Sequence, residues 1–599
     1  MKRRLFFLAI LLAFSCCAQA QNKVILSAMK DELKRSMEQL KLENEAGPYY
    51  ISYNLNDTYS LRIAADSGCI TANSESRGRT LNMNLRVGSY AQDNSNFTSV
   101  SGLSNTASLL SGLVGVAAPL DDDYAVLRRE IWQATDRIYK SALENLTKKK
   151  AALQNTVQSA DLPDFSKSEV ISSLAAENSF SVQKQTWSQL VDQLSKLFLG
   201  EPKIQKSRID FTVLIVNSYH VNSEGSVWIE PTSTTQLSIA AGTQADDGMP
   251  LNNYRIYTAT RPEGLPGRTS LETDIKSLIS ELITARSAPV ATEYSGPVLF
   301  SAQAAGELFS QGFGNLMAAK RLPVIDNPQM NSMVLRSENP FQSKIGMKVA
   351  AGFLSLKAVP TLKSYNQKAL LGSYRIDEEG VFARDVSLVE NGILKNLLTS
   401  RTPVKGFPES NGHARGGAAA PSVIQVISTQ KKTYEQLKQE LVQAAKEEGF
   451  EFGYLVRGIS PPSESLGDDS AAAESILGSA MGGSQKSQFS LTKPFLIFRV
   501  YPDGREEMVR GLDFGPISVN ALKNVLATSQ DEIIYDYPVG IGNVLSGLGG
   551  IISMLGSLGS GGLSDYATVI TPSVLISGID LVKSRGTYPK LPIVPYPTK

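Results

Sequence analysis

The sequence predicts an α+β protein of two domains, an N-terminal sheet-and-helix domain followed by a strand-rich C-terminal domain. Three observations lead to this prediction. The length of 599 residues favours two to four domains. Strand and helix patterns both occur on each side of a candidate linker, Ser287 to Pro297. Hydrophobic residues (42%) and charged residues (20%) have ordinary globular frequencies, which argues against collagen-like and wholly disordered chains. We expect an N-terminal α+β domain with a middle meander over 21–290 and a C-terminal β-rich domain over 297–599.

Residues 1–20 are expected to be a secretory signal peptide rather than part of the fold. Lys2 to Arg4 are basic, Leu5 to Phe14 are apolar, and Ala18 to Ala20 form an A-x-A cleavage site. We therefore expect an exported protein, periplasmic or in the cell envelope. A lipoprotein start at Cys16 or Cys17 is the less favoured alternative, because the bulky Phe14 would lie close to the cleaved bond.

The net charge of the chain does not support a nucleic-acid partner. The 59 basic and 58 acidic residues give a formal net charge of +1. Removing Lys2, Arg3 and Arg4 with the signal peptide changes the balance to 56 − 58 = −2. A polyanion-binding surface is not indicated by such a balance.

The N-terminal domain is expected to begin with an amphipathic helix from Lys23 to Asn44, where apolar residues recur every three or four positions. Alternation of apolar and polar residues then predicts antiparallel strands at Tyr49–Tyr59, Leu61–Ile70 and Thr80–Val87. A long charged helix is predicted over Tyr124–Gln154.

A strand meander is predicted next, with turn residues between its members. Its strands are Ile209–Val216, Ser226–Glu230, Thr234–Ala241 and Asn253–Thr260. Thr269–Arg286 is predicted to be a helix because Thr269 and Glu272 resemble a capping box and precede an apolar stripe.

The C-terminal domain is expected to open at Val298 with a short strand that runs into a helix, and to be rich in strands from there to its end. Asn391-Gly392 predicts a tight hairpin, and Asp503-Gly504 predicts another. One helix is predicted at Thr433–Gly449.

Two uncharged segments rich in glycine, serine and leucine interrupt these patterns, Thr98–Leu120 and Val539–Leu563. The second is long enough to cross a bilayer, but its many glycines lower its hydrophobicity and helix propensity. We expect a surface loop, or a flap that contacts a partner or lipid without spanning the membrane. One mobile lid made of both segments is a further hypothesis.

Histidine and cysteine are scarce, with two and three residues respectively, which excludes most His- or Cys-based metal and catalytic sites. Cys69 is expected to be a buried small hydrophobe, and a nucleophilic Cys69 is the alternative. His220 is expected to be a turn or edge residue rather than a ligand.

The most specific pattern of the chain lies between Leu371 and Arg401 (LGSYRIDEEGVFARDVSLVENGILKNLLTSR), followed by Asn411 to Arg415 (NGHAR). This region resembles the C-terminal part of the TldD/PmbA family of metalloprotease-like proteins. Weaker matches occur at Glu75 to Leu81, in the helix at Ala134 to Leu143, and at Thr571 to Ile576.

The resemblance implies a zinc motif, H-E-x-x-x-H on a helix, completed by a cysteine from the C-terminal half. The corresponding positions here are Ser310, Gln311 and Asn315, and no cysteine follows Cys69. Neutral hydroxyl and amide oxygens bind zinc poorly, and an amide cannot act as the general base. We therefore expect no zinc cofactor and no catalytic residues at this motif.

The family also includes subunits without the metal motif that pair with a catalytic subunit. The resemblance thus implies a non-catalytic partner or peptide-binding subunit, in a homodimer or a heterodimer with a related chain, that binds peptide or unfolded polypeptide. Candidate peptide-binding residues are Asp377, Glu379, Gly380, His413 and Arg415. A divergent active metallopeptidase and an envelope structural protein are the alternatives.

Each of these candidates also has a purely structural interpretation. Asp377 to Gly380 can be a turn only, and Gly312 and Gly314 can serve close helix packing. His413 can be a hydrogen-bonding residue of a glycine-rich loop.

Overall fold

The structure is a computed structural model that describes residues 24–99, 115–154, 162–326, 338–462, 487–539, 565–584, 586 and 588–590. The predicted signal peptide, residues 100–114 of the first uncharged segment and residues 540–563 of the second lie outside the described residues. The lid hypothesis therefore stays a prediction. Among the described residues, none of the helices combines the length and the apolar character that crossing a membrane would need.

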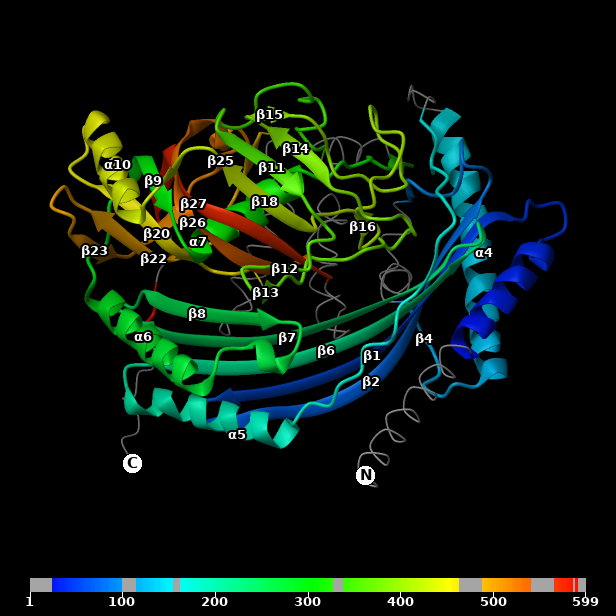
Figure 1. Ribbon diagram of the computed structural model, residues 1–599, viewed down its shortest axis with the longest axis horizontal. Coiled ribbons are helices and arrows are strands. Elements are labelled where there is room, and N and C mark those ends of the chain that lie inside the picture. Colours follow the sequence, from blue (N-terminus) through cyan, green and yellow to red (C-terminus); the bar gives the residue numbers. More distant parts are fainter. Residues whose placement is uncertain are drawn as a thin grey trace, which may run out of the picture.

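A long, strongly curved antiparallel sheet forms the N-terminal part of the chain (Figure 1). Its main strands lie in the order β2-β1-β6-β7-β8, and two short strands pair at its margins. The bounds are β1 Pro48–Asp66, β2 Cys69–Val87, β4 Val116–Ala117, β5 Ser172–Leu174, β6 Lys206–Asn222, β7 Val227–Gln244 and β8 Pro250–Ala259.

Helices cover the outer face of this sheet in two groups (Figure 1). The first helix, residues 24–39, and α4 (Tyr124–Gln154) pack on one end, where Ile51, Tyr53 and Leu55 of β1 join their core. The helices α5 (Lys184–Ser195) and α6 (Arg268–Ser287) pack on the other end, against a second core. Each helix group thus buries one stretch of the apolar face of the strands.

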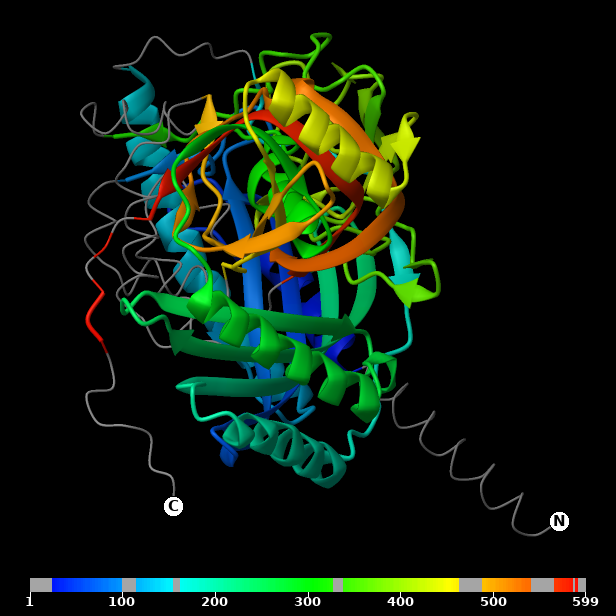
Figure 2. The ribbon, with the colours of Figure 1, turned by 90° about the vertical axis from the view of Figure 1, so that its left-hand side faces the viewer.

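The opposite face of β1 is polar, because the alternating residues Ser52, Asn54, Asn56, Thr58 and Ser60 point the other way. Figures 1 and 2 show that the inner side of the curve, where this face lies, turns toward the C-terminal domain. A polar sheet face thus lines the boundary between the two domains.

The C-terminal domain is built on a twelve-stranded mixed sheet, whose main path is β15-β14-β11-β18-β27-β9-β20-β22-β23. A large apolar core that includes Phe300, Phe313 and Val574 holds it together. The helix α10 (Tyr434–Glu447) packs on it and begins with a capping box between Thr433 and Gln436. The strand bounds are β9 Tyr294–Phe300, β11 Leu354–Ala358, β14 Val386–Glu390, β15 Ile393–Leu394, β18 Val423–Ser428, β19 Lys431–Lys432, β20 Gly453–Ile459, β22 Pro494–Val500, β23 Glu506–Val509, β24 Leu512–Phe514, β26 Val525–Val539 and β27 Asp565–Lys583.

Several short elements complete the described chain. The two-stranded pairs are β10 with β3, β12 with β13, β16 with β17, and β21 with β25. Their bounds are β3 Phe97–Thr98, β10 Val324–Ile325, β12 Ser364–Tyr365, β13 Lys368–Ala369, β16 Ala414–Arg415, β17 Ala418–Ala419, β21 Gln488–Phe489 and β25 Ile517–Ser518, and the short helices are η1 Lys196–Gly200, η2 Pro262–Gly264 and η4 Ala521–Asn524.

The predicted α+β class is confirmed, but five local predictions were wrong. The separate strands expected at Ser226–Glu230 and Thr234–Ala241 are one strand, β7, because it pairs with β6 without interruption. The strands expected at Tyr49–Tyr59 and Leu61–Ile70 are mostly one strand, β1, because the chain turns only at Ser67 and Gly68, both with positive φ. Cys69 is exposed at that hairpin rather than buried. His220 is buried in β6, a central strand, rather than at an edge. The helix α6 starts at Arg268 without a side-chain cap, so the expected capping box at Thr269 is absent.

Candidate functional site

The helix that follows β9 carries the positions of the predicted degenerate metal motif. It consists of α7 (Gln303–Glu307), η3 (Leu308–Phe313) and α8 (Gly314–Leu316), and η3 is a π-helical turn. Buried Leu308, Phe309 and Phe313 anchor it in the C-terminal core. Single π-helical turns within helices are frequent at functional sites, so this helix is a candidate location for a site.

Glu307 is the centre of a buried polar cluster on this helix. Its carboxylate accepts hydrogen bonds from Gln311 Nε2 (2.8 Å), Ser310 Oγ (3.0 Å), Gln303 Nε2 (3.2 Å) and the hydroxyl of Tyr535 in β26. Glu307 is 1% exposed. Burial raises the pKa of Glu307 to about 7, although the hydroxyl and amide donors oppose the rise.

The amide of Gln311 is bonded at both of its atoms. Gln311 Nε2 also donates to Thr492 Oγ1 (2.9 Å), and Gln311 Oε1 accepts from the backbone amide of Thr492 (2.9 Å). Ser310 also donates to the Glu307 carbonyl (3.2 Å). Asn315 is exposed one turn further along. Ser310 and Gln311 therefore belong to one network with Glu307, and Asn315 lies outside it.

Glycines let large side chains approach this helix closely. A Cβ at Gly306 would lie 2.5 Å from Tyr535 Cγ, and a Cβ at Gly312 would lie 2.4 Å from the ring of Phe489. At Gly314 the hydroxyl of Tyr537 would be 3.0 Å away. These distances support the structural interpretation of Gly312 and Gly314 as close-packing positions.

Asp377 holds a turn with its carboxylate. Asp377 Oδ1 accepts the backbone amides of Val381 (2.9 Å) and Glu379 (3.0 Å), and Asp377 Oδ2 accepts that of Ala414 (3.0 Å). Burial, with a smaller contribution from Glu379, raises the pKa of Asp377 to about 7. Gly380 has a φ of 75° and lies so close to Trp228 of the N-terminal sheet that a Cβ would be 3.0 Å from its ring. The turn thus joins the two domains.

Glu379 binds Arg401, which also joins the domains. Glu379 Oε2 accepts the backbone amide of Arg401 at 2.6 Å. The buried guanidinium of Arg401 donates to the Ser166 carbonyl (2.7 Å) and to Glu224 Oε1 (2.7 Å), and it lies 4.0 Å from the ring centre of Phe165. Glu379 therefore holds the backbone of Arg401, whose side chain makes the interdomain contact.

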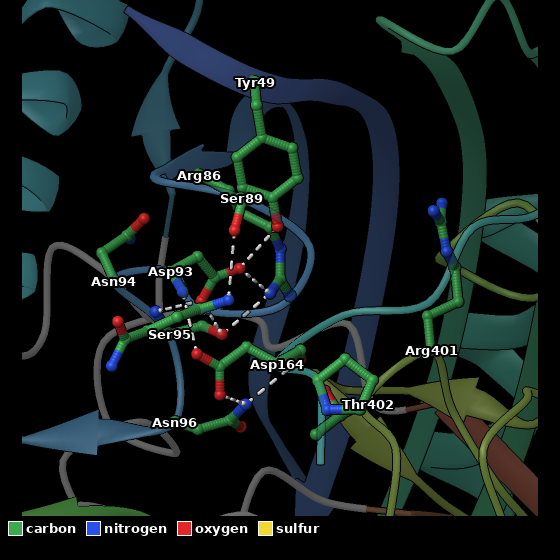
Figure 3. Close-up of polar contacts among 12 residues, drawn as sticks. Tyr49, Arg86, Ser89, Asp93, Asn94, Ser95, Asn96, Asp164, Arg401 and Thr402 are labelled. Carbon is green, nitrogen blue, oxygen red and sulfur yellow. Dashed lines mark hydrogen bonds and ion pairs between the residues drawn. The ribbon is translucent and has the colours of Figure 1, made fainter. Parts of the chain in front are cut away.

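A buried ionic cluster lies near Arg401 (Figure 3). Asp93 accepts from Tyr49 Oη (2.7 Å) and pairs with Arg86 (2.8 Å). Asp164 pairs with Lys149 of α4 (2.5 Å) and, across the domain boundary, with Arg321 (3.0 Å). Each of these charged groups has an oppositely charged partner, so the cluster is better explained as a set of ion pairs that holds the domains together than as a binding site.

His413 and Arg415 have different surroundings. His413 is fully buried, its Nδ1 lies 3.0 Å from Asn411 Oδ1, and burial lowers its pKa to about 4. These contacts agree with the interpretation of His413 as a hydrogen-bonding loop residue, and its burial argues against direct contact with a bound peptide. Arg415 donates to the Tyr566 carbonyl (2.7 Å) and pairs with Asp565 (3.4 Å).

A cleft of about 400 Å³ separates the polar face of the N-terminal sheet from the C-terminal domain. Asn54, Asn56, His220, Trp228 and Glu230 line its N-terminal side. The C-terminal side carries Tyr374, Asp377, Glu378, Arg415, Asp565 and Tyr566. Of the predicted site residues, the cleft brings together Asp377 and Arg415, whereas Ser310, Gln311 and Asn315 do not line it.

The ionisable groups of the cleft are strongly affected by their surroundings. The rings of His220 and Trp228 stack 4.4 Å apart, and burial lowers the pKa of His220 to about 3, so this histidine is neutral. Glu378 is accessible from the cleft but surrounded by protein. Burial and the neighbouring Asp565 raise the pKa of Glu378 to about 8.

Comparison with known proteins gives matches to one family. Residues 293–458 match the family described as PmbA/TldA metallopeptidase C-terminal domain. A metalloprotease of Methanothermobacter thermautotrophicus is 31% identical over 112 residues, which is 18% of this chain and 23% of the relative. A metalloprotease of Archaeoglobus fulgidus is 25% identical over 185 residues, 31% of this chain and 39% of the relative. The chain belongs to the TldD/PmbA family.

The fold of this TldD/PmbA protein is shared over most of its length with solved structures. TldE from Thermococcus kodakarensis has a TM-score of 0.55 at 13% identity and covers 93% of this chain and 100% of its own. A putative modulator of DNA gyrase from Bacteroides thetaiotaomicron has a TM-score of 0.56 at 12% identity, covering 94% and 98%. In sequence, by contrast, the matches span less than half the length of the curated relatives.

The residues at the motif do not fit the zinc ion that membership of the TldD/PmbA family implies. Ser310 and both atoms of the Gln311 amide are held by Glu307 and Thr492. Neither side chain is a good zinc ligand. Among the described residues, no group of three His, Cys, Asp or Glu side chains could hold a metal ion.

Sequence reasoning missed three features of this TldD/PmbA protein. Glu307 has no role among the predictions from sequence, although a charged residue in an apolar helical run is a signal of a buried partner. Arg401 was the end of a family pattern and had no assigned role. The polar face of β1 was visible as alternation, but the sequence did not show what it faces.

Proposed function

We propose that this chain is an exported, non-catalytic member of the TldD/PmbA family that serves as a partner or peptide-binding subunit of a peptide-processing metalloprotease complex. The observation that carries the proposal is the Glu307 network. Ser310 and Gln311 stand where the family places its first histidine and its glutamate, and their polar atoms bond within the protein.

Chemistry at this helix supports a non-catalytic role. Zinc hydrolysis needs a metal-bound water and a base that takes its proton. Gln311 cannot take a proton, and Glu307 is buried beneath four donors. A scaffold of this kind can still hold polypeptide, because binding needs only shape and hydrogen-bonding groups.

Cleavage of an unfolded polypeptide tests the proposal. The purified chain should leave reduced, carboxymethylated casein intact, with or without added zinc, while a relative with an intact H-E-x-x-x-H motif cleaves it. Zinc-dependent cleavage that survives Gln311→Ala would establish a divergent metallopeptidase instead and refute the proposal.

Association with a related chain tests the partner role. Analytical ultracentrifugation of this chain with a motif-bearing relative from the same cell should show a complex of the two. Two proteins that sediment independently, together with a chain that is monomeric when alone, would contradict the partner assignment.

A further inference from the structure

A tight turn lies beside β15, at one margin of the C-terminal sheet. Lys344 to Lys348 (KIGMK) form it, and the backbone amide of Met347 donates to the Lys344 carbonyl (2.9 Å). Gly346, the third residue of the turn, has a φ of 80°, which favours glycine. The amide of Gly346 donates to the Leu394 carbonyl (2.8 Å), and the amide of Leu394 donates to the Met347 carbonyl (3.0 Å). These bonds hold the turn in place against β15, which lies at the top of Figure 1, away from the N-terminal sheet.

Three apolar side chains are exposed together at this turn. Ile345 is 40% exposed, Met347 is 57% exposed and Ile393 of β15 is 36% exposed. Ile393 pairs with Lys348 across an antiparallel bridge, which brings the strand beside the turn. We call Ile345, Met347 and Ile393 the turn patch. Turn residues are usually polar, glycine or proline, and exposed apolar side chains that cluster mark interaction surfaces.

The turn patch is separate from the interdomain cleft. None of its three residues lines that cleft, whose floor is the polar row of β1 that carries Asn54 and Asn56. The patch therefore needs an explanation of its own.

Lysines surround the turn patch. Lys344 and Lys348 flank the turn, and Lys395 follows β15. Burial, and to a smaller extent the neighbouring Lys523, lowers the pKa of Lys344, whose Nζ donates to Asn520 Oδ1 (3.2 Å). Among the described residues, none of these four lysines forms a salt bridge. Like charges that are gathered without acidic partners favour an anionic ligand.

Protection of the sheet edge explains only part of this arrangement. Lysines at the edge of a sheet keep other chains from pairing with it, but exposed Ile345 and Met347 have the opposite effect. Glu390, the cross-strand neighbour of Ile393, brings one negative charge, so the surroundings of the patch stay positive. Apolar tips within a ring of lysines therefore need a partner that is both apolar and anionic.

The surface of an anionic bilayer has both properties. Apolar side chains enter the boundary between headgroups and acyl chains, while the lysines reach the phosphates. A nucleic acid would match the lysines but leave the apolar tips in water. A protein partner is less suitable, because lysine is depleted at protein interfaces.

We propose that the turn patch binds the surface of a bilayer that contains anionic phospholipid, with Ile345, Met347 and Ile393 inserted and the four lysines at the headgroups. The inference goes beyond the proposed function and does not depend on it. It assigns the chain a membrane-facing side without any segment that spans the membrane.

Sedimentation of the full mature chain with lipid vesicles tests the inference. The chain should bind phosphatidylcholine vesicles that contain about 30% phosphatidylglycerol. The partition coefficient should fall about tenfold or more for pure phosphatidylcholine, and also for the anionic vesicles in about 0.5 M sodium chloride. Failure to bind anionic vesicles, or equal binding to both kinds, would overturn the inference.

Charge variants test the role of the lysines. Lys348→Gln with Lys395→Gln should lower the partition coefficient about tenfold or more. Lys140→Gln with Lys148→Gln is the matched control, because both lysines form ion pairs within α4, and it should stay within about twofold. Glu390→Gln should strengthen binding by up to about fivefold, since it removes an opposing charge. Equal binding by all three variants would contradict the assignment to this turn.

Apolar variants test insertion. Ile345→Ser with Met347→Ser should lower the partition coefficient about tenfold or more. Val170→Ser with Leu174→Ser, at positions 64% and 62% exposed in the N-terminal domain, is the control and should stay within about twofold. Near-ultraviolet circular dichroism checks that each variant is folded.

Tryptophan fluorescence distinguishes insertion from adsorption by charge alone. The emission of Met347→Trp, corrected for that of the wild type, should shift to shorter wavelength when anionic vesicles are added. An unshifted spectrum, or wild-type binding by Ile345→Ser with Met347→Ser, would overturn the inference. Tighter binding to a single-stranded oligonucleotide than to vesicles would identify a nucleic-acid surface instead. Loss of a dimer in the apolar variant, with vesicle binding unchanged, would identify a contact between copies of the chain.

Discussion

The Glu307 cluster and the cleft floor are both buried and polar, but their hydrogen bonding differs. At Glu307, hydroxyl and amide donors from the helix and from β26 meet one carboxylate. On the cleft floor, the oxygens of Asn54 and Asn56 have no described partner. A satisfied cluster stabilises the fold and leaves little for a ligand to gain, whereas unsatisfied atoms leave binding energy available. Substitutions should therefore lower the free energy of unfolding much more at the Glu307 cluster than on the cleft floor.

The largest effect is expected from Glu307→Ala. The change removes the buried carboxylate that accepts hydrogen bonds from Gln311, Ser310 and Tyr535, and it opens a cavity. We expect the free energy of unfolding to fall by about 3–5 kcal/mol, measured by urea denaturation. Glu390→Ala, at an exposed hairpin, should change it by less than about 0.5 kcal/mol. A loss below about 1 kcal/mol for Glu307→Ala would show that the cluster is not a structural network.

The pH dependence of stability gives the next largest effect. Because the pKa of Glu307 is raised to about 7 by burial, the folded state holds this proton more tightly than the unfolded state does. Stability from this group is present below the unfolded pKa and is lost as pH rises through the folded pKa. Between pH 4.5 and 7.5, the free energy of unfolding of the wild type should fall by roughly 3 kcal/mol more than that of Glu307→Gln. Asp377 and Glu378 act in the same direction in both proteins, so equal slopes would contradict the assignment to Glu307.

Gly306→Ala should have a smaller effect through packing. The new Cβ would lie 2.5 Å from Tyr535 Cγ, so the ring that donates to Glu307 must move. We expect a loss of about 1–3 kcal/mol in the free energy of unfolding. Gly352→Ala is the control, since nothing lies within 4 Å of its Cβ position. Similar values for the two variants would mean that the helix has room at Gly306.

The smallest change in stability is expected on the cleft floor. Asn56→Leu replaces a buried amide whose oxygen is unpaired with an apolar side chain of similar size. The free energy of unfolding should stay within about 1 kcal/mol of the wild type or rise, by the same denaturation assay. A loss of 2 kcal/mol or more would show that Asn56 has an essential structural partner.

Local elements were predictable from sequence, and tertiary properties were not. The α4 helix and the hairpin at Asn391-Gly392 follow from short-range patterns, and both are present. The full length of β1 depends on its pairing with β2 and with the distant strand β6. The local sequence around Ser60 therefore does not show that the strand continues.

The candidate site was only partly predictable for the same reason. Ser310, Gln311 and Asn315 were located because the family places its motif there. What the residues at these positions do instead of binding zinc depends on Glu307 and on Tyr535, which is 228 residues away from Glu307 in sequence. The burial of His413 and the cleft floor likewise arise from packing between segments that local sequence cannot relate.

Zinc content tests the central claim most directly. The full chain, purified without chelators after equilibration with zinc and then desalted, should hold far less than one zinc ion per chain by inductively coupled plasma mass spectrometry. A relative with an intact H-E-x-x-x-H motif, treated identically, should retain zinc. One zinc ion per chain in the wild type, lost on Ser310→Ala with Gln311→Ala, would contradict the account of Glu307 and its neighbours as a satisfied network in place of a metal site.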